Sequence, residues 1–363
     1  MNAHRREFLR GLAAAVLVDM ALPAPSHAQP DEGTGLSGRI DVHQHFVPER
    51  YRRCAEAAGH GKPDGMPALP RWSRQLALDV MDRHEIAAAV LSISSPGVHF
   101  ADSAAALARA VNEEGAGCVA KHPKRFGLFA SLPLPDVEAA LREIEFSLDV
   151  LKADGIVLLT NYDGIHLGDA RFEPLFSELN RRGTLVFIHP TSPYCPACDG
   201  ASRVAGSSYP APMLEFMFET TRAVTHLILS GTLNRHRKLR VIVPHAGAAL
   251  PTLSDRIAGM LPALAQRPGA TAMPTGKQVL AALRDLYYDV AGHAVPKMLD
   301  ALLRTTGIDH LLYGSDWPFT PEPVAEHLAQ QLAGVDRFNG SMRAQLARGN
   351  ALNLLPRLRA ALQ

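Results

Sequence analysis

Short apolar runs rich in β-branched residues alternate with longer amphipathic segments over almost the whole chain after residue 38. This alternation is typical of repeated βα units, in which helices connect parallel strands. Eight runs have the length and composition of a buried strand: Arg39–His43, Ala88–Ile93, Phe126–Leu132, Gly155–Thr160, Leu185–His189, Leu239–Pro244, Leu286–Val290 and His310–Tyr313. Eight such pairs predict an α/β fold, a (β/α)8 TIM barrel.

Apolar residues at spacings of three and four predict helices between the strands, among them Ala104–Lys121, Val137–Leu151, Glu173–Arg182 and Val295–Thr306. A further apolar segment, Met213–Leu233, is predicted to be one long helix that packs on the barrel or buries a face against another subunit. The 363-residue chain is longer than a minimal barrel of about 250 residues. We therefore expect insertions at Glu49–Arg71 and Thr191–Pro212, on the face of the barrel where substrate loops belong.

The first 28 residues differ from the rest of the chain. A basic start with paired arginines, HRREFLR, precedes a mild apolar run, Gly11–Leu22, and a small residue lies two positions before Ala28. The run is too short for a permanent membrane span, and the pattern is that of a twin-arginine export signal with a cleavage site. We expect a signal peptide over residues 1–28, one barrel domain over 29–363, and a periplasmic protein without membrane association after cleavage.

Composition and charge favour a soluble enzyme that acts on a small molecule. The chain is 47% hydrophobic and 20% charged, with a formal net charge of +1, which is ordinary for a globular domain. It has no basic cluster in its body, so it lacks the electrostatic pattern of a nucleic-acid-binding protein.

Two of the four cysteines form an isolated Cys195-Pro-Ala-Cys198 motif. A structural zinc site would need a second ligand pair at suitable spacing, and no such pair is present in the sequence. In an oxidising compartment the two cysteines could form a local disulfide, but two loop thiols fit the sequence equally well.

Five residues with metal-binding or acid–base side chains stand at the carboxyl ends of predicted strands: His43, His45, His189, His245 and Asp316. These strand ends form one rim of a barrel, so residues far apart in sequence meet there. His43 and His45 flank a single residue, and side chains two apart on a strand share a face. Imidazole nitrogen and carboxylate oxygen together suit zinc or a similar divalent ion. The pattern predicts a metal site at the mouth of the barrel.

Asp41 and seven further histidines are not expected to bind the metal. Asp41 lies two residues before His43, and we expect it to share the face of that histidine lower in the barrel, behind the ligands or as a buried polar residue. Surface or packing roles are expected for seven other histidines: His84, His99, His122, His166, His226, His236 and His293.

Taken together, the motifs resemble the amidohydrolase superfamily, in particular the branch of aminocarboxymuconate-semialdehyde decarboxylase and related aromatic-acid decarboxylases. The motifs are DVHQH from Asp41, IHP from Ile188, VPHAGAALP from Val243, YGSDWPF from Tyr313 and a closing GNAL from Gly349. They extend over nearly the whole chain after the signal. The segment EFMFETTR, followed by VPHAG, is similar to the 6-methylsalicylate decarboxylase subgroup.

This resemblance implies that His43, His45, His189 and Asp316 bind one divalent ion, zinc by preference or manganese. It also implies that His245 is the nearby acid–base histidine, that Asp316 moves a proton as well as binding the ion, and that the protein is a homodimer. Many members of the superfamily hold two ions bridged by a lysine at the end of the fourth strand. Here that strand and the residues after it, GIVLLTNY, contain no lysine, which favours a single ion.

The resemblance also implies the reaction, a decarboxylation of a small aromatic or unsaturated carboxylic acid without a redox cofactor. Asp316 and His245 are the candidate proton donors to the carbon that loses carbon dioxide. A metal-dependent hydrolase of an amide, ester or lactone is the alternative, and an exported metal-binding protein without turnover is a third. Export weakens the decarboxylase hypothesis, since ring catabolism is usually cytoplasmic.

The residues that line the substrate pocket would distinguish a decarboxylase from a hydrolase, because both would use the same residues at the metal. The sequence offers seven candidate residues for it, aromatic or cationic side chains close to the predicted rim: Phe46, Arg50, Arg52, Trp72, Tyr162, Tyr194 and Phe319.

Overall fold

The computed structural model describes residues 36–100, 103–195, 209–265 and 273–363. These lie in one compact unit, Gly35–Gln363. The predicted signal peptide, residues 1–28, and Cys198 lie outside the described residues. The export signal and the possible disulfide between Cys195 and Cys198 therefore remain expectations. Among the helices in the described ranges, none combines the length and the apolar character that a membrane span requires.

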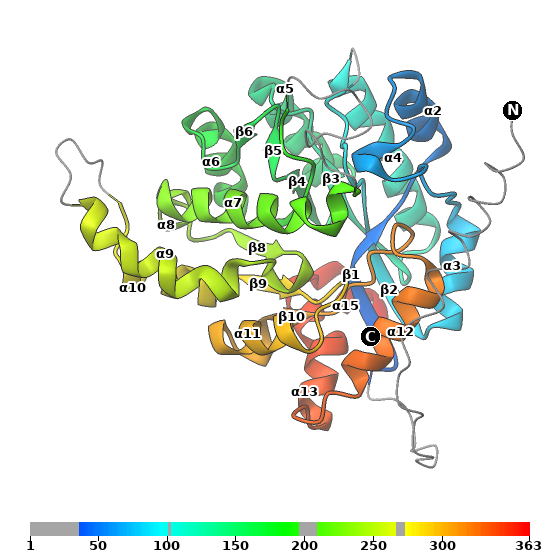
Figure 1. Cartoon of the computed structure of the whole chain (residues 1–363). Helices are drawn as coiled ribbons and strands as arrows, with labels where there is room; N and C mark the ends of the chain where they lie inside the picture. Colours follow the sequence, from blue (N-terminus) through cyan, green and yellow to red (C-terminus); the bar gives the residue numbers. More distant parts are fainter. Residues whose placement is uncertain (1–35, 101–102, 196–208, 266–272) are drawn as a thin grey trace, which may run out of the picture. The chain divides into compact units, whose positions relative to one another are not determined.

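Eight parallel strands form the barrel that the sequence predicts (Figure 1). In their order around the sheet they are β1 (Arg39–His45), β2 (Ile86–Ser92), β3 (Phe126–Ser131), β4 (Gly155–Leu159), β7 (Leu185–His189), β8 (Arg240–Val243), β9 (Tyr287–Asp289) and β10 (Leu311–Leu312). Backbone hydrogen bonds close the sheet, because the N–H of Val42 donates to the carbonyl of Tyr313 at 3.0 Å and the N–H of His45 to that of Trp317 at 2.8 Å. The predicted (β/α)8 fold is confirmed.

Helices follow or precede these strands, and most of them lie around the outside of the barrel. They are α2 (Glu49–Ala57), α3 (Arg74–Arg83), α4 (Ala104–Lys121), α5 (Val137–Glu145), α6 (Glu173–Arg182), α7 (Glu215–Leu229), α8 (Thr232–Arg235), α9 (Leu250–Ala265), α10 (Gly276–Asp285), α11 (Lys297–Thr305), α12 (Glu322–Ala333), α13 (Gly340–Ala344), α14 (Asn350–Leu354) and α15 (Pro356–Leu362). Helices α4 and α6 have the predicted bounds. The Ser103 side chain caps α4, and Gly183 ends α6 in a left-handed conformation.

The structure departs from the predicted elements at several places. The predicted helix Val137–Leu151 ends as an α-helix at Glu145 and continues as a π-helical turn, Phe146–Val150. The predicted helix Met213–Leu233 is divided into α7 and α8, because the chain turns through Gly231 with a φ of 75°. A short hairpin, β5 (Asn161–Tyr162) and β6 (Ile165–His166), follows β4 and was not predicted. Its turn consists of Asp163 and Gly164, both with positive φ, which is the Asp-Gly pattern of a tight hairpin. Helices α9 and α10 also form an unpredicted pair, side by side in Figure 1.

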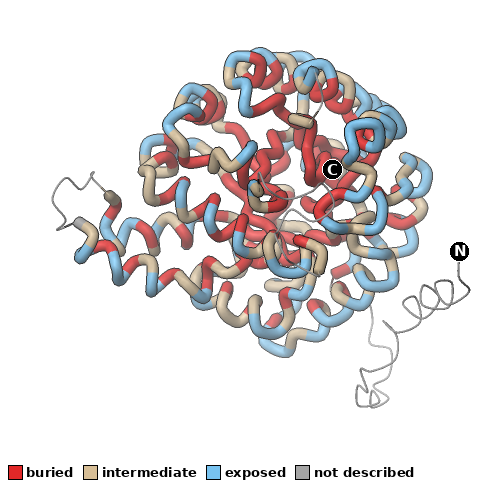
Figure 2. Tube along the Cα trace, turned by 45° about the horizontal axis from the view of Figure 1, so that its top comes forward, coloured by how far each residue is buried: buried red, intermediate tan, exposed pale blue. Residues whose placement is uncertain are grey.

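The apolar core has an inner and an outer layer. The inner layer fills the barrel with side chains from most of the strands, such as Val42, Phe129 and Phe187. Leu354 of α14 and Leu358 of α15 close the end of the barrel at which the strands begin. Each such side chain contributes about 1.5 to 3 kcal/mol when it is fully buried. Figure 2 shows the buried segments at the centre and exposed outer faces on the surrounding helices. The space for a ligand is therefore at the opposite end of the barrel, where the strands end.

An irregularity in β1 corrects the expected position of Asp41. Asp41 pairs with Ala89 and Gln44 with Leu91, so three steps along β1 match only two along β2. Such a bulge inserts one extra residue and reverses the alternation of faces. Asp41 consequently does not share the face of His43. It is fully buried on the other side of the strand, where it accepts hydrogen bonds from the backbone N–H and the hydroxyl of Ser315.

Candidate metal centre

The structure brings together four of the five predicted rim residues. One potential ligand atom from each of His43, His45, His189 and Asp316 lies within 4.8 Å of the others. The histidines are at the ends of β1 and β7, and Asp316 is in the loop after β10. All three imidazoles are buried, and Asp316 is 20% exposed toward the pocket. This arrangement is a candidate site for one metal ion.

Hydrogen bonds orient the three imidazoles. The Nδ1 atom of His43 lies 3.0 Å from a carboxylate oxygen of Asp289. The Nδ1 atom of His189 lies 2.7 Å from the carbonyl of Pro190, and that of His45 lies 3.1 Å from the hydroxyl and 3.3 Å from the carbonyl of Ser92. The carboxylate of Asp289 and the carbonyl of Pro190 can only accept, so Nδ1 of His43 and of His189 carries the hydrogen and Nε2 keeps its lone pair. The Ser92 hydroxyl can donate or accept, so for His45 only the carbonyl contact favours the same tautomer.

The remaining ring nitrogens meet in a way that needs a cation. The Nε2 atoms of His43 and His45 lie 3.1 Å apart, and Asp316 Oδ1 lies 3.4 Å and 3.2 Å from them. Lone pairs and a carboxylate at these separations repel one another unless positive charge lies between them. Three imidazoles and one carboxylate are a donor set that first-row divalent ions accept. The residues therefore fit the metal that the sequence predicts.

The pKa values of the same groups agree with this charge balance. Burial lowers the pKa of His45 and holds that of His189 well below its usual range. At His43 burial acts in the same direction, but Asp289 and Asp316 outweigh it and raise the pKa to about 10. Burial would raise the pKa of Asp316, but the imidazoles of His245, His43 and His45 hold it well below its usual range. Asp316 is thus an ionised ligand, and in the absence of a metal His43 is the histidine that takes up a proton.

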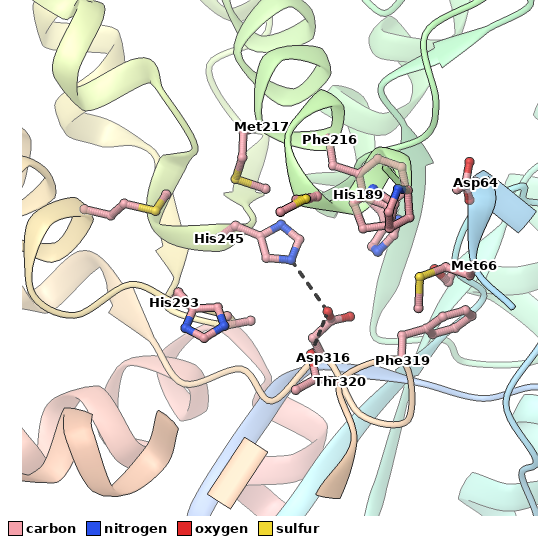
Figure 3. Close-up of a pocket in the computed structure, with 17 residues that line it drawn as sticks. Asp64, Met66, His189, Phe216, Met217, His245, His293, Asp316, Phe319 and Thr320 are labelled. Atoms are coloured by element: carbon pink, nitrogen blue, oxygen red, sulfur yellow. Dashed lines mark hydrogen bonds and ion pairs between the residues drawn. The ribbon is translucent and has the colours of Figure 1, made fainter. Parts of the chain in front are cut away.

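His245, the fifth predicted residue, lies beside the cluster rather than in it. Its Nε2 atom is 3.9 Å from Oδ2 of Asp316, as the dashed line in Figure 3 indicates. Its Nδ1 atom is buried and has no hydrogen-bond partner among the described residues. The position permits His245 to hold a proton next to Asp316, and its predicted acid–base role stays a prediction.

A cavity of about 450 Å³ opens directly on the cluster, a size typical of small-molecule sites. In Figure 3, Asp64 and Met66 lie on one side of it, and His245 and His293 lie on the other. Most of its wall is apolar or aromatic, with contributions from Met66, Pro210, Pro212, Met213, Phe216, Met217, Ala291, Met298 and Phe319. A flat ring with few polar substituents suits such a wall.

Of the seven side chains that the sequence proposes for the pocket, only Phe319 lines it. Phe46 and Tyr162 belong to the buried core, and Trp72 packs edge-on against Phe46. Arg52 pairs with two glutamates of its own helix, and Tyr194 is 51% exposed. Which insertion residues reach a pocket depends on how the loops fold back over the barrel, and their sequence alone does not determine that path.

Residues without a predicted binding role form the rest of the polar wall. His293, expected at the surface or in packing, lines the pocket in the loop after β9, and Asp64 reaches it from a 3-10 turn, Pro63–Gly65. For His293 the available signal was its place just after a predicted strand, on the same face as the metal ligands. Asp64 lies in the first predicted insertion, but nothing in its local sequence distinguishes it from other loop carboxylates.

Asp289 is a further residue near the metal ligands that the sequence did not single out. It is fully buried at the end of β9. One oxygen faces Nδ1 of His43, and the other accepts the N–H groups of His245 and Ala291, all at 3.0 Å. A carboxylate at the end of an otherwise apolar strand was the signal that could have identified it.

This chain resembles known proteins in sequence and in fold. The sequence profile of the Amidohydrolase family matches residues 40–357. A 6-methylsalicylic acid decarboxylase of Penicillium expansum is 36% identical over 89% of this chain and 98% of that protein. The crystal structure of an amidohydrolase II superposes with a TM-score of 0.79, with 32% identity over 88% of this chain and 99% of that chain.

A second solved structure contains a metal. It is a dihydroxybenzoic acid decarboxylase from Polaromonas sp. JS666 with bound manganese and the inhibitor 2-nitroresorcinol, at 25% identity and a TM-score of 0.72 over 88% of this chain and 97% of that chain. The family profile covers most of the barrel and all four residues of the cluster, His43, His45, His189 and Asp316. The chain therefore belongs to the amidohydrolase family.

Proposed function

We propose that this protein is a metal-dependent, non-oxidative decarboxylase of a small aromatic carboxylic acid, with 6-methylsalicylate as the first candidate substrate. The observation that carries the proposal is a single cluster of metal-binding side chains, with His245 beside it, at the base of an apolar cavity. The relative with 36% identity, which is aligned over almost its whole length, supports the reaction class.

The reaction needs a carboxylate holder and a proton donor. A bound divalent ion would hold the carboxylate and an adjacent ring oxygen and would offset their charge. His245 then holds a proton beside the ionised Asp316, facing the ring carbon that bears the carboxylate. Transfer of this proton forms a C–H bond, and the electrons of the breaking C–C bond return to the ring as carbon dioxide leaves. General acid catalysis of this kind contributes about 10²- to 10⁴-fold.

The apolar wall favours this reaction over the hydrolysis that the same polar residues could also support. Met217, Phe216 and Phe319 surround the space above the cluster, and a wall of this kind keeps water away from the ring carbon while carbon dioxide leaves. A hydrolase of esters, lactones or amides needs a water molecule at the same place. Hydrolysis therefore remains the alternative outcome of the experiment below.

We propose zinc or manganese as the ion. Three imidazole nitrogens and one carboxylate oxygen suit zinc, which the sequence favours. Manganese is supported by the Polaromonas structure. Both ions belong in the first experiment, because the donor set accepts either.

We also propose that the protein is exported through the twin-arginine route and works in the periplasm as a homodimer. The basic start and the apolar run of residues 1–28 support export, to be checked by cell fractionation. Met213 and Phe218, which are 72% and 43% exposed near the start of α7, support an apolar contact between copies. Light scattering of the purified protein would give the mass.

Carbon dioxide release tests the proposed reaction directly. Purified protein, loaded separately with zinc and manganese, is assayed with 6-methylsalicylate, salicylate, 2,6-dihydroxybenzoate and an aminocarboxymuconate-type acid, and metal content is determined on the same samples. We expect release from at least one aromatic acid, with loss of activity on chelation and recovery on return of the ion. One ion per chain with no release from any acid, together with turnover of an ester, lactone or amide panel, would show a hydrolase instead.

A further inference from the structure

We infer that Asp289 is a positioning residue that acts on both halves of the site, because it fixes the tautomer of the metal ligand His43 and anchors the backbone of the loop that carries His245. Its two oxygens divide these tasks. Oδ2 faces Nδ1 of His43 at 3.0 Å, and Oδ1 accepts the N–H of His245 and that of Ala291, each at 3.0 Å.

The first task concerns the hydrogen on His43. A carboxylate has no hydrogen to donate, so Nδ1 of His43 must be the N–H, and Nε2 must keep the lone pair that binds metal. Asp289 is fully buried, so no water competes for this contact. The orientation of the ring is fixed by the same hydrogen bond, since β9 and β1 hold both residues in place.

The second task concerns the loop after β8. Four consecutive residues, from His245 to Ala248, have φ between 53° and 77°, and only Gly247 among them lacks a Cβ atom. A left-handed conformation is unfavourable for a residue with a Cβ atom, so the surrounding structure must hold this loop. Two side chains do so from opposite ends. Asp289 accepts the N–H of His245, and the Thr221 hydroxyl accepts the N–H of Ala249 at 3.1 Å.

Asp289 and Thr221 therefore form a natural pair for comparison. Both anchor the same strained loop, but only Asp289 also touches a metal ligand. Thr221 lies on α7, where its hydroxyl donates to the carbonyl of Met217 at 2.7 Å. If the inference is right, loss of Asp289 affects metal binding and the His245 loop together, whereas loss of Thr221 affects the loop alone.

The test uses Asp289→Asn, with Thr221→Val as the matched control. Asparagine has the shape of aspartate but only one oxygen, and two backbone N–H groups compete for it. Its amide nitrogen then faces His43 and donates to Nδ1, which moves the hydrogen of the ring to Nε2. We expect metal affinity, measured by competition with a chromophoric chelator, to fall by about 10- to 100-fold. In Thr221→Val the metal affinity should equal that of the parent, while kcat at saturating metal falls.

A second measurement reads the tautomer itself and requires no metal binding. Nitrogen-15 NMR of the metal-free parent at high pH, with the His43 signal identified by its loss in His43→Gln, should show the hydrogen on Nδ1. In Asp289→Asn the signal should change to the Nε2–H form. The inference is overturned if His43 of the parent carries its hydrogen on Nε2, or if Asp289→Asn binds metal as tightly as Thr221→Val does.

The inference rests on the proposed use of these residues as a metal site, but its readouts require no turnover. Metal affinity and imidazole tautomer can follow the expected pattern even if no aromatic acid is decarboxylated. That outcome would leave the role of Asp289 intact and refute only the proposed reaction. The reverse outcome, carbon dioxide release with an unaltered metal affinity in Asp289→Asn, would refute the role of Asp289 and leave the reaction standing.

Discussion

Replacement of His189 by alanine is expected to abolish stoichiometric metal binding and activity together. Four-ligand zinc sites bind their ion with about 10 to 16 kcal/mol, so one ligand accounts for about 3 to 4 kcal/mol, or roughly 10²- to 10³-fold in affinity. His189 supplies one of the four donors at the cluster, and its neighbours, held by β1 and β7, cannot move to replace it. Metal content after gel filtration and carbon dioxide release are the two measurements.

A histidine outside the site provides the control for this variant. His327 is exposed on α12, where its ring lies 3.1 Å from the side chain of Gln331. His327→Gln should keep one ion per chain and full activity. A His189→Ala protein that is folded by circular dichroism and still retains one ion with the affinity of the parent would show that His189 is not a ligand.

The position of the ligands could be predicted from the sequence because it follows from the repeat. Each βα unit places the end of its strand on the same rim, and the sequence marks those ends with His43, His189 and Asp316. No knowledge of loop structure is needed for this step. The same reasoning places His245 near the cluster, and the structure puts its Nε2 atom 3.9 Å from Asp316.

What could not be predicted depends on contacts between distant segments. The bulge in β1 that separates Asp41 from the face of His43 results from pairing with β2 and from contacts to Ser315, neither of which is encoded locally. Asp289 is a single polar residue at the end of a short strand, and only the folded arrangement brings it against His43. Alternation along a strand predicts faces, but it does not predict which neighbouring side chain lies opposite.

The residues of the pocket wall were even harder to predict from the sequence. The insertion after β1 was predicted, yet its contributions to the pocket are Asp64 and Met66 rather than Arg50, Arg52 or the nearby Trp72. Aromatic and cationic residues in an insertion are as useful for packing or for pairing within a helix as for binding a substrate. Only the three-dimensional path of the loop separates these uses.

Replacement of His245 by asparagine is expected to leave metal binding intact and to lower kcat by about 10²- to 10⁴-fold, the usual contribution of a general acid or base. His245 lies outside the four-donor cluster, so the ion does not depend on it. Asparagine is the appropriate substitute because His245 has a φ of 54°, a conformation that asparagine tolerates better than most residues with a Cβ atom. The backbone N–H that Asp289 accepts also remains.

The measurements for this variant are metal content, kcat and KM on the same preparation. A KM close to that of the parent with a much lower kcat would mean that substrate still binds while proton transfer is lost. Full activity would show that His245 is not the acid–base residue, and Asp316 would be the other residue at the cluster that the resemblance assigns to proton transfer. Because His245 would move a proton in either a decarboxylase or a hydrolase, this variant tests the site, and only the choice of substrate identifies the reaction.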